Sequence, residues 1–244
     1  MQPLKNNVAA FDKDVLANQG YRYTTNASYS ARVANQRLTD ITVQILNSLK
    51  PKSIIDVGCG DGVYTSEIKQ EFSSLEVSGF DPAAQAIALA SKLYPEITFF
   101  VDNVLNEDFA PGKHYDTAIL RGVLHHLDQP ELALTNTAAI ADALLIIEPN
   151  GNNPILKLIE KRSQYHIEHE EKSYSIRELK LFCKQAHCSL ERVYYVGFVP
   201  FFFPTWPAKL LHFLQPLLER TPLINRFFSA QIVLVVSSEK NIRG

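Results

Sequence analysis

The chain has 244 residues, of which 46% are hydrophobic and 20% are charged, and its formal net charge is −2 at pH 7. This length and composition allow a sizeable core, as one large domain or a domain with a cap, and exclude an intrinsically disordered chain. The charge provides no general attraction for phosphate backbones, so no nucleic-acid partner is expected.

The first fifty residues are predicted to form an N-terminal helical extension or cap, ahead of one domain that spans residues 51–244. A polar, aromatic stretch is followed by a predicted helix over residues 30–49, which Pro51 terminates. From there, short β runs alternate with helical segments. The predicted strands cover residues 53–57, 76–80, 97–101, 116–120, 143–148, 190–196 and 231–237, and the predicted helices cover residues 63–72, 82–93, 130–141 and 176–186.

Some predicted strands are apolar on both faces, as at residues 144–147, which is typical of central parallel strands covered by helices. The alternation of strands and helices predicts an α/β fold with a doubly wound, mostly parallel sheet. An apolar insert at about residues 197–228 separates the last two strands. We interpret it as a cap on the sheet, a dimer surface or a wall for a hydrophobic acceptor, and a transient membrane-surface contact is a further alternative. One helical stripe of the insert consists of Leu210, Leu211, Phe213, Leu214, Leu217 and Leu218.

A glycine-rich turn follows the first strand. Asp56 lies near the end of the strand. Gly58, Gly60 and Gly62 follow at alternate positions, and the chain then becomes helical. Such a turn lets a ligand lie directly on the backbone, and the first helical amides favour electron-rich groups. No Gly-Lys-Ser/Thr follows, which excludes a P-loop, and the place of the third dinucleotide-binding glycine is taken by Val63.

The pattern Asp-x-Gly-x-Gly-x-Gly over residues 56–62 resembles the first motif of class I S-adenosylmethionine-dependent methyltransferases. Asp81 closes the second predicted strand, Asp102-Asn103 follows the third, and Arg121 opens the segment after the fourth, in the family's order. All lie at carboxyl ends of strands, where open α/β sheets bind ligands. The resemblance covers about residues 53–150. It implies a Rossmann-like seven-stranded sheet with an antiparallel final strand, and S-adenosyl-L-methionine as the cofactor.

The resemblance also implies roles for these positions. Asp81 stands where the family's acid binds both ribose hydroxyls, and one carboxylate can accept two hydrogen bonds. Asp102 stands where an acid binds the adenine amino group, and Arg121 belongs to the segment beside the methionine part. Each position has a structural alternative, such as a tight turn or an ordinary helix N-terminus at Asp81-Pro82. The predicted cofactor-binding residues are Asp56, Gly58, Cys59, Gly60, Asp81, Pro82, Asp102, Asn103 and Arg121.

The catalytic candidates are histidines, because the cofactor's methyl is already activated and a general base is needed only when the acceptor must lose a proton. His125 and His126 directly follow the fourth strand, and His169 lies in a charged cluster after the fifth. The first pair can also be structural, and the cluster can be a solvated turn. Glu148, at the end of the fifth strand, either faces the acceptor or caps the next helix.

These patterns predict methyl transfer to a small, partly hydrophobic acceptor, with oxygen favoured over carbon. Ubiquinone- and menaquinone-pathway and small-molecule O-methyltransferases build acceptor sites from additions like the insert and the Tyr-rich N-terminal segment. The alternatives are a non-catalytic S-adenosylmethionine-binding subunit and, less favoured because of Val63, an NAD-dependent enzyme. Cys59, Cys183 and Cys188 have no metal-ligand spacing and are read as reduced thiols, so we expect a cytoplasmic protein without a metal. No transmembrane segment is predicted, and a homodimer remains open.

Overall fold

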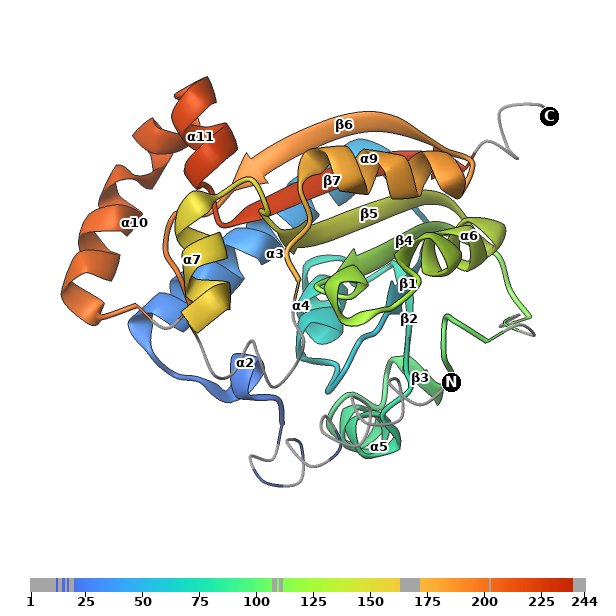
Figure 1. Cartoon of the computed structure of the whole chain (residues 1–244). Helices are drawn as coiled ribbons and strands as arrows, with labels where there is room; N and C mark the ends of the chain where they lie inside the picture. Colours follow the sequence, from blue (N-terminus) through green and yellow to red (C-terminus); the bar gives the residue numbers. More distant parts are fainter. Residues whose placement is uncertain are drawn as a thin grey trace.

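The computed structural model describes residues 12, 15, 17, 20–106, 109, 112–162, 172–201 and 203–238. In this part of the chain, one seven-stranded sheet has the strand order β3-β2-β1-β4-β5-β7-β6 (Figure 1). The strands are β1 (Ser53–Val57), β2 (Glu76–Asp81), β3 (Thr98–Val101), β4 (Tyr115–Arg121), β5 (Ala141–Pro149), β6 (Cys188–Val196) and β7 (Gln231–Ser238). The helices are α2 (Arg22–Thr25), α3 (Tyr29–Leu49), α4 (Val63–Glu71), α5 (Ala84–Leu93), the 3-10 turn η1 (Leu124–His126), α6 (Pro130–Ile140), α7 (Pro154–Arg162), α9 (Ile176–Gln185), α10 (Thr205–Glu219) and α11 (Pro222–Phe228).

The predicted fold class is confirmed. Strand β7 runs antiparallel to β5 and β6, and the other neighbouring strands are parallel. Each predicted strand and helix ends within two residues of the observed one. The helix α9 begins at the expected capping box, in which Ser175 accepts from the Glu178 amide and the Glu178 carboxylate accepts from the Ser175 amide.

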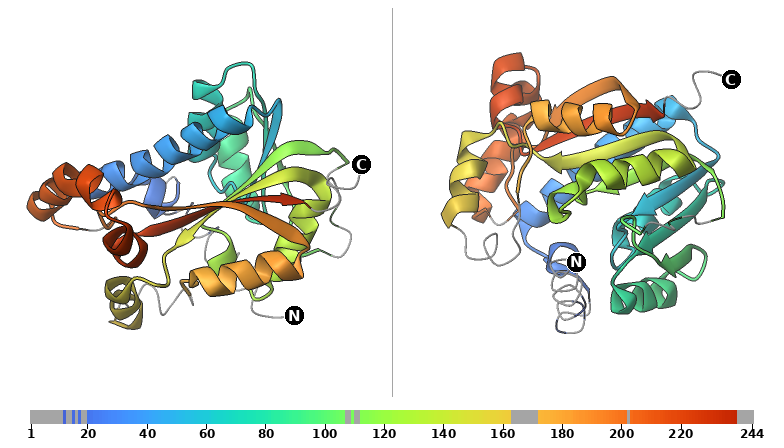
Figure 2. Two further views of the ribbon diagram at one scale, coloured as in Figure 1. Left: turned by 90° about the horizontal axis from the view of Figure 1, so that it is seen from above. Right: turned by 45° about the vertical axis from the view of Figure 1, so that its right-hand side comes forward.

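Helices cover both faces of the sheet, and alternate residues of the central strands pack on opposite faces. Ile55 and Leu144 belong to the cluster that includes α6 and α9 residues, whereas Ile54 and Leu145 belong to the cluster that includes α3 and α4 residues. Figure 2 (left) shows α3 and α9 on opposite sides of the strands. This two-sided packing explains why the central strands are apolar at consecutive positions.

The insert between β6 and β7, for which a cap, a dimer surface and an acceptor wall were the alternatives, forms two helices. These are α10 and α11; one side of the apolar stripe of α10 is exposed, with Leu210 at 47% and Phe213 at 82%, while Leu211, Leu214 and Leu218 are half-buried. Helix α3 covers one face of the sheet. Helix α10 instead lies beside α3, where the Tyr29 hydroxyl and His212 Nδ1 are 2.7 Å apart.

Candidate functional site

The loop after β1 is built around glycines that adopt left-handed backbone conformations. Gly58, Gly60 and Gly62 have φ values of 70°, 55° and 76°. A Cβ atom at Gly58 would lie 2.9 Å from Val123 Cγ2, and one at Gly60 would overlap the Tyr21 ring. The loop therefore requires glycine both for its backbone angles and for the close approach of neighbouring segments.

Asp81 ties this loop to the end of β2. Its Oδ2 accepts a 3.0 Å hydrogen bond from the Gly60 amide, and its Oδ1 accepts a 2.8 Å bond from the Ala83 amide. Burial raises the pKa of this carboxyl to about 6, against the lowering effect of the two amides. Each oxygen keeps further accepting capacity, so the carboxylate can also bind two hydroxyl groups of a ligand.

Asp56 lies beneath the loop and is buried. Its Oδ2 accepts a 2.5 Å hydrogen bond from Thr65 Oγ1 in α4. Burial raises its pKa to about 6, while the Thr65 hydroxyl and the Arg121 charge oppose that shift. This acid therefore connects β1 to the first turn of α4 and holds the loop from below.

Cys59 contributes packing from its side chain. Its amide donates to the Phe80 carbonyl at 3.0 Å, and a Cβ at Gly79 would lie 3.0 Å from its Sγ. Burial raises the pKa of this thiol well above its usual value, so it stays protonated. The predicted contact of Cys59 with the cofactor stays a prediction.

Arg121, at the end of β4, faces the helices that flank the loop. Its guanidinium donates to Thr39 Oγ1 at 3.2 Å and to the Asn35 carbonyl at 3.3 Å, and it lies 3.6 Å from the centre of the Tyr64 ring. These contacts fasten β4 to α3 and α4. Its predicted contact with the cofactor remains a prediction.

The remaining predicted cofactor residues lie at the ends of β2 and β3. The Asp102 amide donates to the Asp81 carbonyl at 3.3 Å, which brings the two acidic positions together. Asp102 Oδ1 accepts from the Asn103 amide at 2.7 Å, and Asn103 Oδ1 accepts from the Leu105 amide at 3.0 Å. Pro82 precedes Ala83, the N-cap of α5, so the helix begins two residues later than the predicted start at Pro82.

His125 and Glu148 form a pair beside the glycine loop. Glu148 is fully buried, and its Oε1 accepts from the amides of Val123 and Leu124 at 3.0 and 2.7 Å. Its Oε2 lies 2.8 Å from His125 Nδ1. A carboxylate facing Nδ1 selects the ring tautomer that carries its proton there, which leaves Nε2 able to accept a proton.

The role of Glu148 was only partly predictable. Sequence reasoning placed it at the end of β5 as an acceptor contact or a helix cap, whereas the structure pairs it with His125. The sequence feature pointing to such a role is an acidic residue that ends an apolar strand, because a buried carboxylate requires several donors. The His126 ring packs on His125 with centroids 3.9 Å apart, and His169 lies outside the described residues.

The N-terminal segment covers the glycine loop through Asp61, a residue that sequence reasoning did not select. Asp61 Oδ2 accepts from the Tyr21 amide at 2.8 Å and from Thr24 Oγ1 at 2.5 Å. The Tyr21 ring thereby rests on Gly60. Burial, followed by the Asp81 carboxylate, raises the pKa of the Tyr21 phenol, which therefore stays protonated.

Comparison with known proteins gives a family model described as "Methyltransferase domain", which matches residues 29–192. Malonyl-[acyl-carrier protein] O-methyltransferase of Halalkalibacterium halodurans is 26% identical over 42% of this chain and 37% of its own length. O-methyltransferase rstn1 of Aspergillus nomiae is 29% identical over 50% of this chain and 56% of its own length. The chain thus spans between about a third and just over half of these curated relatives.

A solved structure extends the likeness over nearly the whole fold. The plantazolicin methyltransferase BamL, solved with SAH and a triazolic desmethylPZN analog, has a TM-score of 0.63 at 18% identity. The match covers 97% of each chain.

Proposed function

This protein belongs to the class I S-adenosylmethionine-dependent methyltransferase family, and on that premise we propose that it methylates a small, partly hydrophobic acceptor on oxygen. Methyl transfer from S-adenosylmethionine is the activity of the family, and the acceptor is our proposal. Both curated relatives described above carry the name O-methyltransferase, which supports oxygen over carbon.

The residues after β1 and β2 fit the cofactor. S-adenosylmethionine supplies a methyl group that is already activated on a cationic sulfur. Asp81 would hold the ribose hydroxyls, because each of its oxygens keeps accepting capacity beside one backbone amide. Asp102 would accept from the adenine amino group. Gly58 and Gly60 would shape the backbone beside the cofactor, and the Tyr21 ring that lies against Gly60 would exclude water.

The observation that carries the proposal is the 2.8 Å contact between Glu148 Oε2 and His125 Nδ1. The pair lies at the carboxyl edge of the sheet, and Val123 in the same segment packs directly on Gly58. With its Nδ1 proton held by Glu148, His125 would take the proton of an acceptor hydroxyl at Nε2. The buried carboxylate would stabilise the imidazolium that forms, as in other carboxylate–histidine pairs.

The test is release of S-adenosylhomocysteine over a panel of hydroxyl-bearing small molecules, with wild type and His125→Gln compared on every acceptor that turns over. We expect His125→Gln to lower kcat by about 10²–10⁴-fold while cofactor binding, measured by calorimetry, stays unchanged. His114→Gln is the control, because His114 pairs with Asp142 at the opposite edge of the sheet. Equal turnover of His125→Gln and wild type on a hydroxyl acceptor would contradict the proposed base. If only carbon acceptors turn over, oxygen is the wrong target atom.

A further inference from the structure

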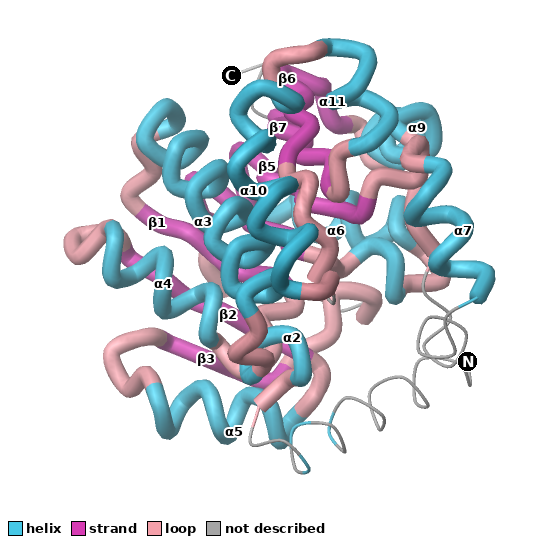
Figure 3. The backbone as a smooth tube through the Cα atoms, turned by 90° about the vertical axis from the view of Figure 1, so that its left-hand side faces the viewer, coloured by secondary structure: helices cyan, strands magenta, loops and turns pink. Residues whose placement is uncertain are grey.

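Exposed large hydrophobic side chains are concentrated on three helices at one end of the molecule. Ten of the thirteen such residues in the described part of the chain lie on α7, α10 and α11. Figures 1 and 3 show these helices together at one end of the protein. We call this set the apolar face: Ile155, Leu158, Trp206, Leu210, Phe213, Leu217, Leu223, Ile224, Phe227 and Phe228. A surface helix normally turns such residues inward, so this arrangement calls for a partner.

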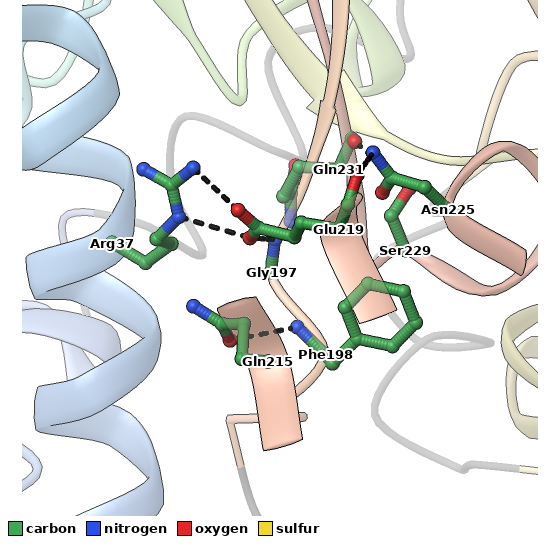
Figure 4. A network of polar contacts seen from close by, with 8 residues as sticks. All are labelled: Arg37, Gly197, Phe198, Gln215, Glu219, Asn225, Ser229 and Gln231. Carbon is green, nitrogen blue, oxygen red and sulfur yellow. Dashed lines mark hydrogen bonds and ion pairs between the residues drawn. The ribbon is translucent and has the colours of Figure 1, made fainter. Parts of the chain in front are cut away.

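Polar contacts attach the inner side of α10 to α3 and to the loop after β6, as Figure 4 shows. Arg37 in α3 donates to both oxygens of Glu219, at 2.9 and 2.7 Å. Glu219 Oε1 also accepts from the Gly197 amide at 2.9 Å, and Gln215 Oε1 accepts from the Phe198 amide at 3.1 Å. These contacts hold α10 with Leu210, Phe213 and Leu217 exposed, while Leu211, Leu214 and Leu218 are half-buried.

On α10, α11 and the turn between them, the exposed charges have one sign. Between residues 197 and 230 the cations are Lys209, Arg220 and Arg226, and all three are exposed. The acid in this stretch of sequence is Glu219, which Arg37 pairs on the inner side. Helices α10 and α11 and the turn between them therefore combine exposed large apolar side chains, one of them tryptophan, with exposed positive charge.

The apolar face lies at the sheet edge that carries the proposed site. Strand β6 pairs antiparallel with β7, and β7 pairs antiparallel with β5, so β6 ends and β7 begins at the carboxyl edge of β5. Helices α10 and α11 join these two strands and therefore project from that edge, where Glu148 also lies. In the described residues, no helix combines the length and the apolar character needed to cross a membrane.

We propose that the apolar face docks on the surface of a lipid bilayer that contains anionic headgroups. Aromatic and aliphatic side chains would enter the interface, while Lys209, Arg220 and Arg226 would reach the headgroup phosphates. A second copy of the chain fits less well, because a two-fold contact would place the cations of one copy near those of the other. The proposal concerns a surface that contains none of the proposed methyl-transfer residues, so the two can fail separately.

The single tryptophan of the chain gives a direct test, because Trp206 lies on the apolar face and is 76% exposed. The full-length protein is titrated with phosphatidylcholine vesicles, with and without phosphatidylglycerol. We expect a blue shift of the emission, quenching by bromine-labelled acyl chains, and co-flotation that is stronger with phosphatidylglycerol and weaker at high salt. No spectral shift and no flotation with either vesicle would overturn the proposal.

Matched variants locate the contact. Phe213→Ser with Leu217→Ser should weaken vesicle binding at least tenfold, because each loses a large apolar side chain from the interface. The control is Leu93→Ser with Leu181→Ser, which changes residues of α5 and α9 that are 50% and 52% exposed but lie outside the apolar face. The control should bind vesicles as wild type does. Equal losses in the two double variants would overturn the assignment to this face.

Light scattering without lipid tests whether a second copy of the chain, rather than a lipid bilayer, covers the apolar face. A dimer that dissociates in Phe213→Ser, together with no vesicle binding by wild type, would assign the face to a second copy and overturn the proposal. Thermal unfolding and calorimetric binding of S-adenosylmethionine confirm that each variant is folded. Cofactor binding that persists when vesicle binding is lost also separates failure of this proposal from failure of the proposed function.

Discussion

The Glu148 carboxylate lies 2.8 Å from the His125 imidazole, and this pair joins the end of β5 to η1. The same carboxylate accepts hydrogen bonds from the amides of Val123 and Leu124, so its orientation is fixed before any ligand binds. A base held in this way needs little reorganisation when it accepts a proton.

We expect Glu148→Gln to lower kcat by about 10²–10⁴-fold with a hydroxyl acceptor while cofactor affinity stays within about twofold. With its oxygen on the two amides, the glutamine would present NH₂ to His125 Nδ1 and move the ring proton to Nε2. The pH–rate profile should lose the limb that reports the histidine. Asp142→Asn removes the exposed partner of His114 and serves as the control. Wild-type turnover by Glu148→Gln would contradict the pairing's role.

Asp81→Asn should weaken S-adenosylmethionine binding by about tenfold or more, because a charged acceptor of two hydroxyl bonds is replaced by an amide. The pKa of Asp81 is raised to about 6, chiefly by burial. Wild-type affinity should therefore fall as the pH falls through about 6, when the carboxyl protonates. Calorimetry at pH 5 to 8 measures both effects. An equal pH dependence in wild type and Asp81→Asn would show that another group is responsible.

Asp56 should make the free protein less stable as the pH rises. Its pKa is about 6 in the folded state against 3.8 for a solvent-exposed aspartate, so between these values the folded state binds more protons. The stability contribution is therefore present below about pH 4 and is lost as the pH passes 6, by about 3 kcal/mol. Relative to wild type, Asp56→Asn should gain stability between pH 4 and 7 in denaturant unfolding.

Asp116 provides a control of opposite sign for that experiment. The Lys52 amide is the main group that lowers the pKa of Asp116, and the Ser53 amide adds to it. Its stabilisation is present above the unfolded pKa and is lost as the pH falls. Asp116→Asn should therefore be less stable than wild type throughout the range from pH 4 to 7, and the difference should shrink as the pH falls below about 4. The same trend in both variants would contradict the assignment of the two shifts.

Gly60→Ala should destabilise the protein more than Gly112→Ala does. Both residues have positive φ, 55° and 72°, so each alanine costs about 1–2 kcal/mol of backbone strain. At Gly60 the new Cβ would also overlap the Tyr21 ring, whereas at Gly112 it would meet nothing within 4 Å. The difference in unfolding free energy measures the contact between Tyr21 and the loop, and equal losses would show that this contact is weak.

Local sequence patterns predicted the strands, the helices between them and the glycine loop, because each of these depends on residues close in sequence. The contact of Tyr21 with Gly60 was not predictable, since it depends on how a segment forty residues away folds back through Asp61. The exposed side of α10 was also not predictable. Periodicity identifies an apolar stripe, but only the packed fold shows which of its residues stay exposed.

The insert joins β6 and β7, the two strands at one end of the sheet, and this position has a consequence for how the protein can diverge. Strands β6 and β7 form one end of the sheet, whereas the glycine loop and Asp81 belong to β1 and β2 near the other end. A different segment grafted between Val196 and Gln231 would leave the pairings of β1, β2 and β4 intact. The proposed lipid-binding surface could therefore be exchanged as one segment without changing the strand pairings around the glycine loop.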